Sequence, residues 1–233
     1  LGSGNTTLLI HILYNSQNLK IAVLVNDFGD IDIDSQLLTS IDQDVVQLSN
    51  GCICCTINDG LVEAVYDVLE KTECVDYLVI ETTGIADPLP IMLTFLGTEL
   101  RDFTHLDSVI TLVDASEFNQ DHFNSEAALK QIIYGDIILL NKADLVNPNS
   151  LYQLEFQINE IKENARIIRC QNAKVPLSLI LDAGYNNPQA YQGLIGEEIE
   201  QTRRDHKDTE HDHHDHGHHD HEHHHHHSSH LDN

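Results

Sequence analysis

Short apolar runs rich in β-branched residues recur along this chain and alternate with longer segments of helical character. The runs lie at residues 20–26, 76–81, 108–113 and 136–140, with a weaker one at 166–170. Continuous apolar runs of this length indicate strands buried on both faces, as in a parallel sheet. Helices are expected between them, at about 7–14, 57–71, 88–97, 124–133 and 149–163. This order predicts an α/β domain with a mainly parallel sheet flanked by helices.

The composition changes sharply toward the end of the 233 residues. We assign residues 1–184 to the α/β domain, because the apolar runs stop there. Residues 185–205 are polar, contain an Asn-Asn-Pro turn signal and are expected to form a linker. Residues 206–233 consist almost wholly of His, Asp and Glu, so this tail is predicted to be disordered and to bind metal. The aspartates interleaved among its histidines argue against an expression tag.

The net charge of −26 limits the partners of the protein. A strongly acidic chain is repelled by nucleic acids and by anionic membrane surfaces, so neither is expected as a partner. No apolar run is long enough to span a membrane, and no signal peptide is recognisable. Five cysteines, three of them clustered, do not make a disulfide framework and indicate a reducing compartment. We therefore expect a cytoplasmic protein.

Residues 2–7, Gly-Ser-Gly-Asn-Thr-Thr, have the character of a phosphate-binding loop. In the pattern Gly-x-x-x-x-Gly-Lys-Ser/Thr, Gly4 takes the second glycine, Asn5 the lysine and Thr6 the magnesium-binding hydroxyl. Small residues let backbone N–H groups approach phosphates, and the N-terminus of the following helix adds favourable potential. Because Asn5 carries no charge, binding is expected to be weaker by about ten- to a hundredfold. Alone, the segment would be better interpreted as an ordinary glycine turn.

Residues 141–144, Asn-Lys-Ala-Asp, follow the apolar run at 136–140 and predict a guanine-binding loop. The loop leaves the carboxyl edge of the predicted sheet, where ligands bind in open α/β folds. The Asp144 carboxylate can accept hydrogen bonds from the N1–H and exocyclic amine of guanine, a pair of donors that adenine does not offer. The alternative is a plain helix-capping turn.

Residues 81–88 follow another apolar run and carry Glu81 and Gly84. An acidic residue at this place can hold a magnesium-bound water, and Gly84 can direct its backbone N–H to a γ-phosphate. The alternative is a loop that caps the next helix through Asp87 and Pro88.

Three cysteines within four positions, Cys52, Cys54 and Cys55, form a compact set of thiol ligands. Thiolates favour zinc or copper(I) over magnesium or calcium. Three thiolates leave a tetrahedral ion one ligand short, and Asp27, Asp30 or a nucleotide-dependent water could complete the site. The alternatives are buried packing cysteines or a redox pair.

Taken together, these segments resemble those of the CobW-type metallochaperone GTPases, relatives of the urease and hydrogenase nickel-insertion GTPases. The family pattern runs Gly-x-Leu-Gly-Ser-Gly-Lys-Thr-Thr, Asn-Glu-Phe-Gly-Glu, Gly-Cys-x-Cys-Cys, Glu-x-x-Gly-x-x-x-Pro and Asn-Lys-x-Asp. The corresponding segments occur here in the same order and at fitting spacing, over about residues 1–184. The resemblance implies a P-loop NTPase-like fold that binds GTP and Mg²⁺ and handles zinc, cobalt or nickel.

The resemblance also implies a role for each matching residue. Nucleotide binding falls to Gly2, Ser3, Gly4, Asn5, Thr6, Thr7, Asn141, Lys142 and Asp144, and hydrolysis to Thr6, Glu81 and Gly84. The transferred metal would be held by Cys52, Cys54 and Cys55, while Asp27 and Asp30 stand where the family has glutamates near the switch and are candidates to complete the site. The tail resembles the His-rich segment of many members, and its candidate ligands are His211, His213, His214, His216, His218 and His219.

Three departures from the family pattern bear on activity. Asn5 replaces the lysine, and we expect the sequence to be truncated at both ends, without the strand before the phosphate loop and without the C-terminal domain. That strand would sit in the middle of the sheet. The first functional hypothesis is a GTP-dependent metallochaperone that delivers metal to a client protein on GTP hydrolysis. The alternative is an impaired family member that acts as a non-enzymatic metal buffer; an acidic tail that serves only solubility is a third possibility.

Overall fold

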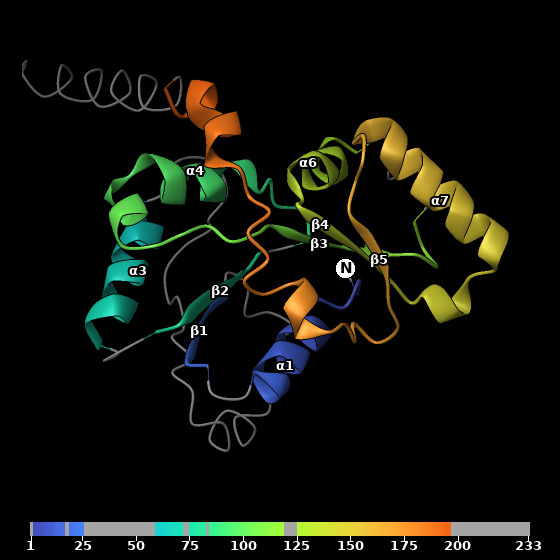
Figure 1. The fold of residues 1–233 in the computed structure, drawn as a ribbon, viewed down its shortest axis with the longest axis horizontal. Helices are drawn as coiled ribbons and strands as arrows, with labels where there is room; N and C mark the ends of the chain where they lie inside the picture. Colours follow the sequence, from blue (N-terminus) through green and yellow to red (C-terminus); the bar gives the residue numbers. More distant parts are fainter. Residues whose placement is uncertain are drawn as a thin grey trace, which may run out of the picture.

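Strands and helices alternate along the chain in the computed structural model, which describes residues 2–16, 19–25, 59–71, 75–82, 84–118 and 125–196 (Figure 1). In these residues the strands are β1 (Ile21–Val25), β2 (Tyr77–Glu81), β3 (Ile110–Asp114), β4 (Ile137–Asn141) and β5 (Ile167–Arg169). The α-helices are α1 (Asn5–Asn15), α3 (Asp59–Lys71), α4 (Leu89–Gly97), α6 (Glu126–Tyr134) and α7 (Pro148–Ile161). Short 3₁₀ turns are η1 (Glu99–Asp102), η2 (Ala143–Leu145), η3 (Leu177–Leu179) and η4 (Pro188–Tyr191). The predicted α/β class is confirmed.

All the strand pairs in the described part of the chain are parallel, and they form two sheets. One sheet pairs β1 with β2, and the other has the order β3-β4-β5. Parallel pairing brings the carboxyl ends of neighbouring strands to one edge, so Asp114 at the end of β3 lies opposite Asn141 at the end of β4. This edge collects the loops from which the candidate site is built.

Alternate residues of β4 face two different helical layers, because successive side chains of a strand point to opposite faces. Ile137 and Leu139 pack with Leu9 of α1, whereas Ile138 and Leu140 pack against α6 and α7. The cluster around α1 also includes Ile21 and Val23 of β1, so this helix covers one face of both sheets. On the opposite face of β1, α3 and α4 bury Ala22 and Leu24.

A largely apolar cavity of about 660 Å³ separates the two sheets. β2 and β3 line it from opposite sides, and α1, α3 and α4 contribute Leu8, Val65 and Phe95 to its wall. The cavity lies where the described strands divide into two groups.

Asn186 and Tyr191, in the segment from residue 185 that the sequence predicted to be a linker, contact the domain. The Asn186 backbone N–H donates to the carbonyl of Asp107 (3.2 Å) and its side chain to Asp136 (3.2 Å). The rings of Tyr191 and Tyr134 lie 6.4 Å apart. The exact boundary between domain and linker stays a prediction, and the tail at 206–233 lies outside the described residues. Within the described part of the chain, no helix has both the length and the apolar character needed to cross a bilayer.

Candidate functional site

Two left-handed glycines shape the loop that leads into α1. Gly2 has φ 84° and Gly4 has φ 110°, conformations that favour glycine. Gly4 is also tightly surrounded, because a Cβ added there would lie 2.4 Å from Asn141 Nδ2. α1 begins at Asn5, two residues earlier than the sequence predicted, since the loop feeds directly into the first helical turn. The N-terminus of this helix lies at the loop, as a phosphate-binding role requires.

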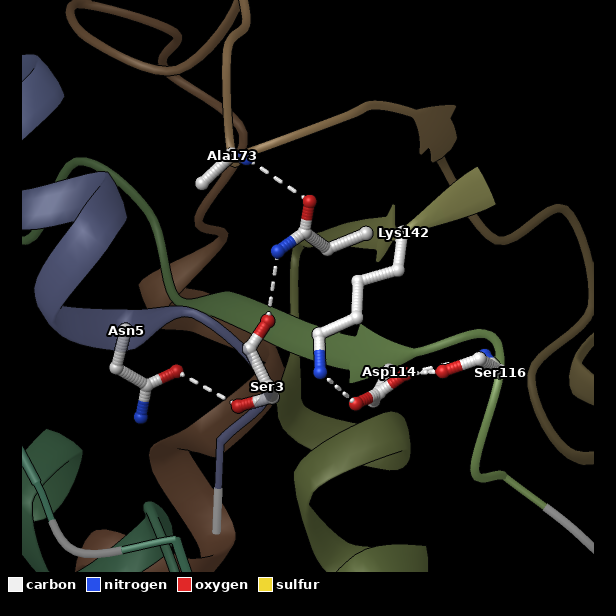
Figure 2. Close-up of polar contacts among 7 residues, drawn as sticks. Ser3, Asn5, Asp114, Ser116, Lys142 and Ala173 are labelled. Atoms are coloured by element: carbon white, nitrogen blue, oxygen red, sulfur yellow. Dashed lines mark hydrogen bonds and ion pairs between the residues drawn. The ribbon is translucent and has the colours of Figure 1, made fainter. Parts of the chain in front are cut away.

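Asn5 stands where a phosphate loop would carry its lysine. Its side-chain oxygen accepts a hydrogen bond from the Ser3 hydroxyl at 3.2 Å (Figure 2). The amide is therefore held by the loop itself, and the position offers no positive charge.

The amide of Asn141 ties three separate segments together at the carboxyl edge. Its Nδ2 donates to the carbonyl of Ser3 at 2.8 Å, and its Oδ1 accepts from the backbone N–H of Ala173, also at 2.8 Å (Figure 2). The Asn141 side chain is buried, with only 2% of the residue exposed. The phosphate loop and the Asn-Lys-Ala-Asp loop, which are far apart in sequence, are thus held side by side.

Ala173 is a site residue that the sequence analysis missed. The loop after β5 places Asn172 and Ala173 at φ 52°, which directs the Ala173 N–H at Asn141. Nearby, the Cys170 thiol lies 3.7 Å from Asn141 Oδ1, and burial raises the pKa of this thiol to about 11. Cys170 is therefore a protonated thiol at neutral pH. The loop carries no recognisable sequence signal apart from its place after the last predicted strand.

Asp114 is a second site residue that the sequence analysis missed. It forms an ion pair with Lys142. The Lys142 Nζ lies 2.5 Å from Asp114 Oδ2, while Asp114 Oδ1 accepts from the Ser116 N–H (3.0 Å) and hydroxyl (2.6 Å) (Figure 2). Burial alone would raise the pKa of Asp114, but the bonds from Lys142 and Ser116 outweigh it and hold the pKa below its ordinary value. An acidic residue at the end of β3, beside the Asn-Lys-Ala-Asp loop, was the available signal.

Asp144 is exposed, as a base-reading carboxylate must be in an unliganded site. Gln171 donates to its Oδ2 at 3.1 Å. Asn141, Lys142 and Asp144 each have a partner from another segment, so the whole Asn-Lys-Ala-Asp loop is oriented before a ligand binds.

Glu81, at the carboxyl end of β2, faces Thr6 of α1. The Thr6 hydroxyl donates to Glu81 Oε1 at 3.5 Å, whereas Glu81 Oε2 is buried without a hydrogen-bond partner among the described residues. Burial raises the pKa of Glu81, and the bond from Thr6 only partly opposes this. A hydroxyl and a carboxylate are oxygen ligands of the kind that Mg²⁺ prefers, directly or through water. The unsatisfied oxygen therefore fits the magnesium site that the sequence predicted.

The loop at residues 84–88 is fixed from the side of α6. Gln131 Nε2 donates to the carbonyls of Gly84 (3.1 Å) and Ala86 (2.9 Å), and Lys130 forms a 2.9 Å ion pair with Asp87. Asp87 Oδ1 also accepts from the N–H of Leu89 at the start of α4. The predicted helix-capping role is therefore present, in the same loop that carries Gly84.

The predicted metal ligands Cys52, Cys54, Cys55, Asp27 and Asp30 lie outside the described residues, as do the tail histidines from His211 to His219. Within the described ranges, no group of three or more His, Cys, Asp or Glu side chains is arranged to hold a metal ion. The metal assignments stay predictions.

Replacing Glu81 by glutamine should stabilise the protein at neutral pH. Because the folded-state pKa is raised, the stability linked to this group is full below its ordinary pKa of 4.5 and is lost as the pH rises through the raised value. Glutamine cannot ionise, so it does not lose stability as the pH rises. Thermal unfolding at several pH values measures the effect: the melting temperature of E81Q should exceed that of the original protein near pH 7 and match it near pH 4.

Glu63, an exposed residue of α3, provides the control. E63Q removes one carboxylate from an accessible position and should leave the melting temperature nearly unchanged. An E81Q protein that melts at the same temperature as the original near pH 7 would contradict the unfavourable burial of Glu81.

Residues 1–169 match the model of the CobW/HypB/UreG nucleotide-binding domain. The chain is 37% identical over 222 residues to zinc-regulated GTPase metalloprotein activator 1 of Dictyostelium discoideum, in an alignment that covers 79% of this chain and 46% of that protein. It is 36% identical over 187 residues to the zinc chaperone YjiA of Escherichia coli, covering 78% and 58%. The chain thus spans about half the length of these curated relatives.

Solved structures agree with this relationship. The Zn(II)-bound YjiA GTPase from Escherichia coli superposes with a TM-score of 0.61 at 34% identity, covering 80% of this chain and 60% of that one. The hydrogenase maturation factor HypB from Archaeoglobus fulgidus gives a TM-score of 0.51 at 17% identity over 83% and 85% of the chains, which shows a shared fold. With the family model matching well over half of its residues, the chain belongs to the CobW/HypB/UreG family of nucleotide-binding proteins.

Proposed function

We propose that the protein is a GTP-dependent metallochaperone that binds zinc and delivers it to a client protein when GTP is hydrolysed. The observation that carries the nucleotide part is the hydrogen bond from Asn141 to the Ser3 carbonyl, which joins the phosphate loop to the Asn-Lys-Ala-Asp loop. The names of the two curated relatives, a zinc chaperone and a zinc-regulated GTPase metalloprotein activator, support zinc as the cargo. Cobalt and nickel remain chemically compatible with the same ligands.

Different parts of GTP would be bound by different segments of the site. Backbone N–H groups and the N-terminus of α1 face the phosphates, and the carboxylate of Asp144 accepts from N1–H and the exocyclic amine of guanine. Thr6 and Glu81 would hold Mg²⁺, which when bound neutralises phosphate charge. Gly84 would present its backbone N–H to the γ-phosphate. Its loop, held by Gln131 through two carbonyls, would then register the loss of that phosphate.

The cargo would be held by the thiolates of Cys52, Cys54 and Cys55, with Asp27 or Asp30 completing the site. The histidines of the tail would add a second store of metal. A cytoplasmic location suits the cysteine site, since a reducing compartment keeps the three thiols available as ligands.

A non-enzymatic metal buffer is the second candidate, and Asn5 favours it. Asn5 takes the lysine position and is bonded to Ser3, and the ammonium of Lys142 is paired with Asp114. A site with this arrangement binds phosphates through backbone groups and a metal ion, with less charge stabilisation of the transferring phosphoryl group. The binding of zinc by the cysteines and the tail would not depend on the residue at position 5.

Metal-stimulated GTP turnover decides between the two candidates. The chaperone should hydrolyse GTP faster with zinc than without it, and it should bind GDP more tightly than ADP in calorimetry because Asp144 reads the base. Asp144→Asn exchanges one acceptor oxygen for a donor and should reduce the preference for GDP. Tight zinc binding without turnover would select the buffer, and equal affinities for GDP and ADP would contradict the guanine assignment.

Restoring the lysine should tighten the phosphate site. Asn5→Lys adds one charge-assisted contact to the phosphates, so the affinity for GTP should rise by about ten- to a hundredfold, and turnover should increase. Asn15→Lys, at the other end of α1, adds the same charge away from the loop and is the matched control. An unchanged affinity in N5K would mean that the loop has adapted to asparagine or that nucleotide is not used.

Two separable classes of metal site should differ in their response to pH. Imidazole binds metal only when neutral, so the affinity of the tail should fall steeply below its ordinary pKa of about 6.5. Thirteen histidines lie between His211 and His230, and this many equivalent donors should bind several ions weakly. The three cysteines should bind one ion tightly, because thiolates bring negative charge.

Zinc titration against a competing chelator tests this division. Deleting residues 206–233 should remove the weak, multiple class and leave the single tight site. Replacing Cys52, Cys54 and Cys55 with serine should do the reverse. If the triple-serine protein retains the tight site, the cysteines are not its ligands.

A further inference from the structure

We propose that Asp114 is a positioning residue of the nucleotide site: it fixes Lys142 in the conformation that receives the guanine nucleotide, and Ser116 fixes Asp114 in turn. This inference rests on the proposed binding of guanine nucleotides. It assigns a role to a carboxylate on β3 that belongs to neither the phosphate loop nor the Asn-Lys-Ala-Asp loop.

The register of the sheet brings Asp114 to Lys142. Asp114 lies opposite Asn141 in the pairing of β3 with β4, so Lys142, one residue further, leaves the strand beside the end of β3. Lys142 has a left-handed backbone at φ 57°, which is uncommon for a residue with a side chain. The side chain runs from the end of β4 to Asp114 (Figure 2).

The two oxygens of Asp114 have different partners, and these partners show which residue of the ion pair is fixed. Oδ1 receives both the N–H and the hydroxyl of Ser116, and Oδ2 receives the ammonium of Lys142 at 2.5 Å. Only 12% of the Asp114 side chain is exposed, against 36% for Lys142. A mostly buried carboxylate held by two donors is a fixed anchor, and the lysine is the movable partner.

Anchoring matters because a free lysine side chain has many rotamers that a bound ligand would have to restrict. Because Asp114 holds its far end, the aliphatic stem of Lys142 keeps one conformation and offers a fixed apolar surface against which a purine can rest. Preorganisation of this kind improves affinity without adding a contact to the ligand.

A double-mutant cycle measured with GDP tests the proposal. Asp114→Asn keeps the shape of the side chain but removes its charge, and should raise the dissociation constant for GDP by about 3- to 10-fold. Lys142→Met keeps an unbranched apolar stem and removes the ammonium, so GDP binding should weaken but stay measurable. Because Asp114 acts through Lys142, D114N should have no further effect in the K142M protein. Ser116→Ala should weaken binding in the same direction, by less.

Glu155→Gln is the matched control, since it breaks the ion pair between α7 and Arg169 of β5 and changes the net charge equally. It should leave the dissociation constant unchanged. If D114N weakens GDP binding equally with and without Lys142, or has no effect, Asp114 does not position the lysine. A failure of the unsubstituted protein to bind GDP would overturn the proposed function instead. If D114N does not fold, the effect of S116A on GDP binding can be compared between the original protein and the K142M protein.

Discussion

The side-chain amide of Asn141 is the contact on which the arrangement of the site depends. It is almost fully buried and donates to the phosphate loop while it accepts from the loop after β5. A buried amide left without these partners would cost stability, so the three segments are held together by the need to satisfy one side chain. Gly4 belongs to the same constraint, because any larger residue would collide with this amide. The phosphate loop therefore keeps its shape through a residue more than a hundred positions away in sequence.

The contacts of Asn141 stabilise the fold, whereas the burial of Glu81 destabilises it. One of its oxygens is buried without a hydrogen-bond partner among the described residues, and burial raises its pKa. Such a group is unfavourable in the protein without ligands, and a cation or an ordered water would relieve it. Thr6 contributes a single long hydrogen bond, which is too little to compensate for the lost hydration. The proposed binding of Mg²⁺ thus accounts for a feature that folding alone does not favour.

Periodicity was sufficient to predict the strands and most helices, because each strand is a short run dominated by apolar residues. β4, with every residue buried, is the clearest case. Glu81 and Asn141 end strands, Lys142 follows one, and Thr6 lies in the first turn of α1, so the predicted elements were enough to place these residues; their roles stay predictions. Asp114 ends a predicted strand, but its pairing with Lys142 depends on sheet register, and the contact of Ala173 depends on left-handed backbone; neither contact is encoded in a local pattern. Polar contacts such as that of Asn186 with Asp136 leave no apolar pattern in the sequence, so periodicity does not predict them.

The distribution of charge around the phosphate loop links the two proposals. Within the described residues, the lysine position holds a neutral amide, and the ammonium of Lys142 is neutralised by Asp114. The charge of a bound polyphosphate would then be met by backbone N–H groups, by the N-terminus of α1 and by Mg²⁺ at Thr6 and Glu81. Affinity at such a site comes from preorganised geometry more than from side-chain charge. That explains why so many contacts here, from Asn141 to Ser116, hold other residues in place and leave direct contact with the ligand to a few.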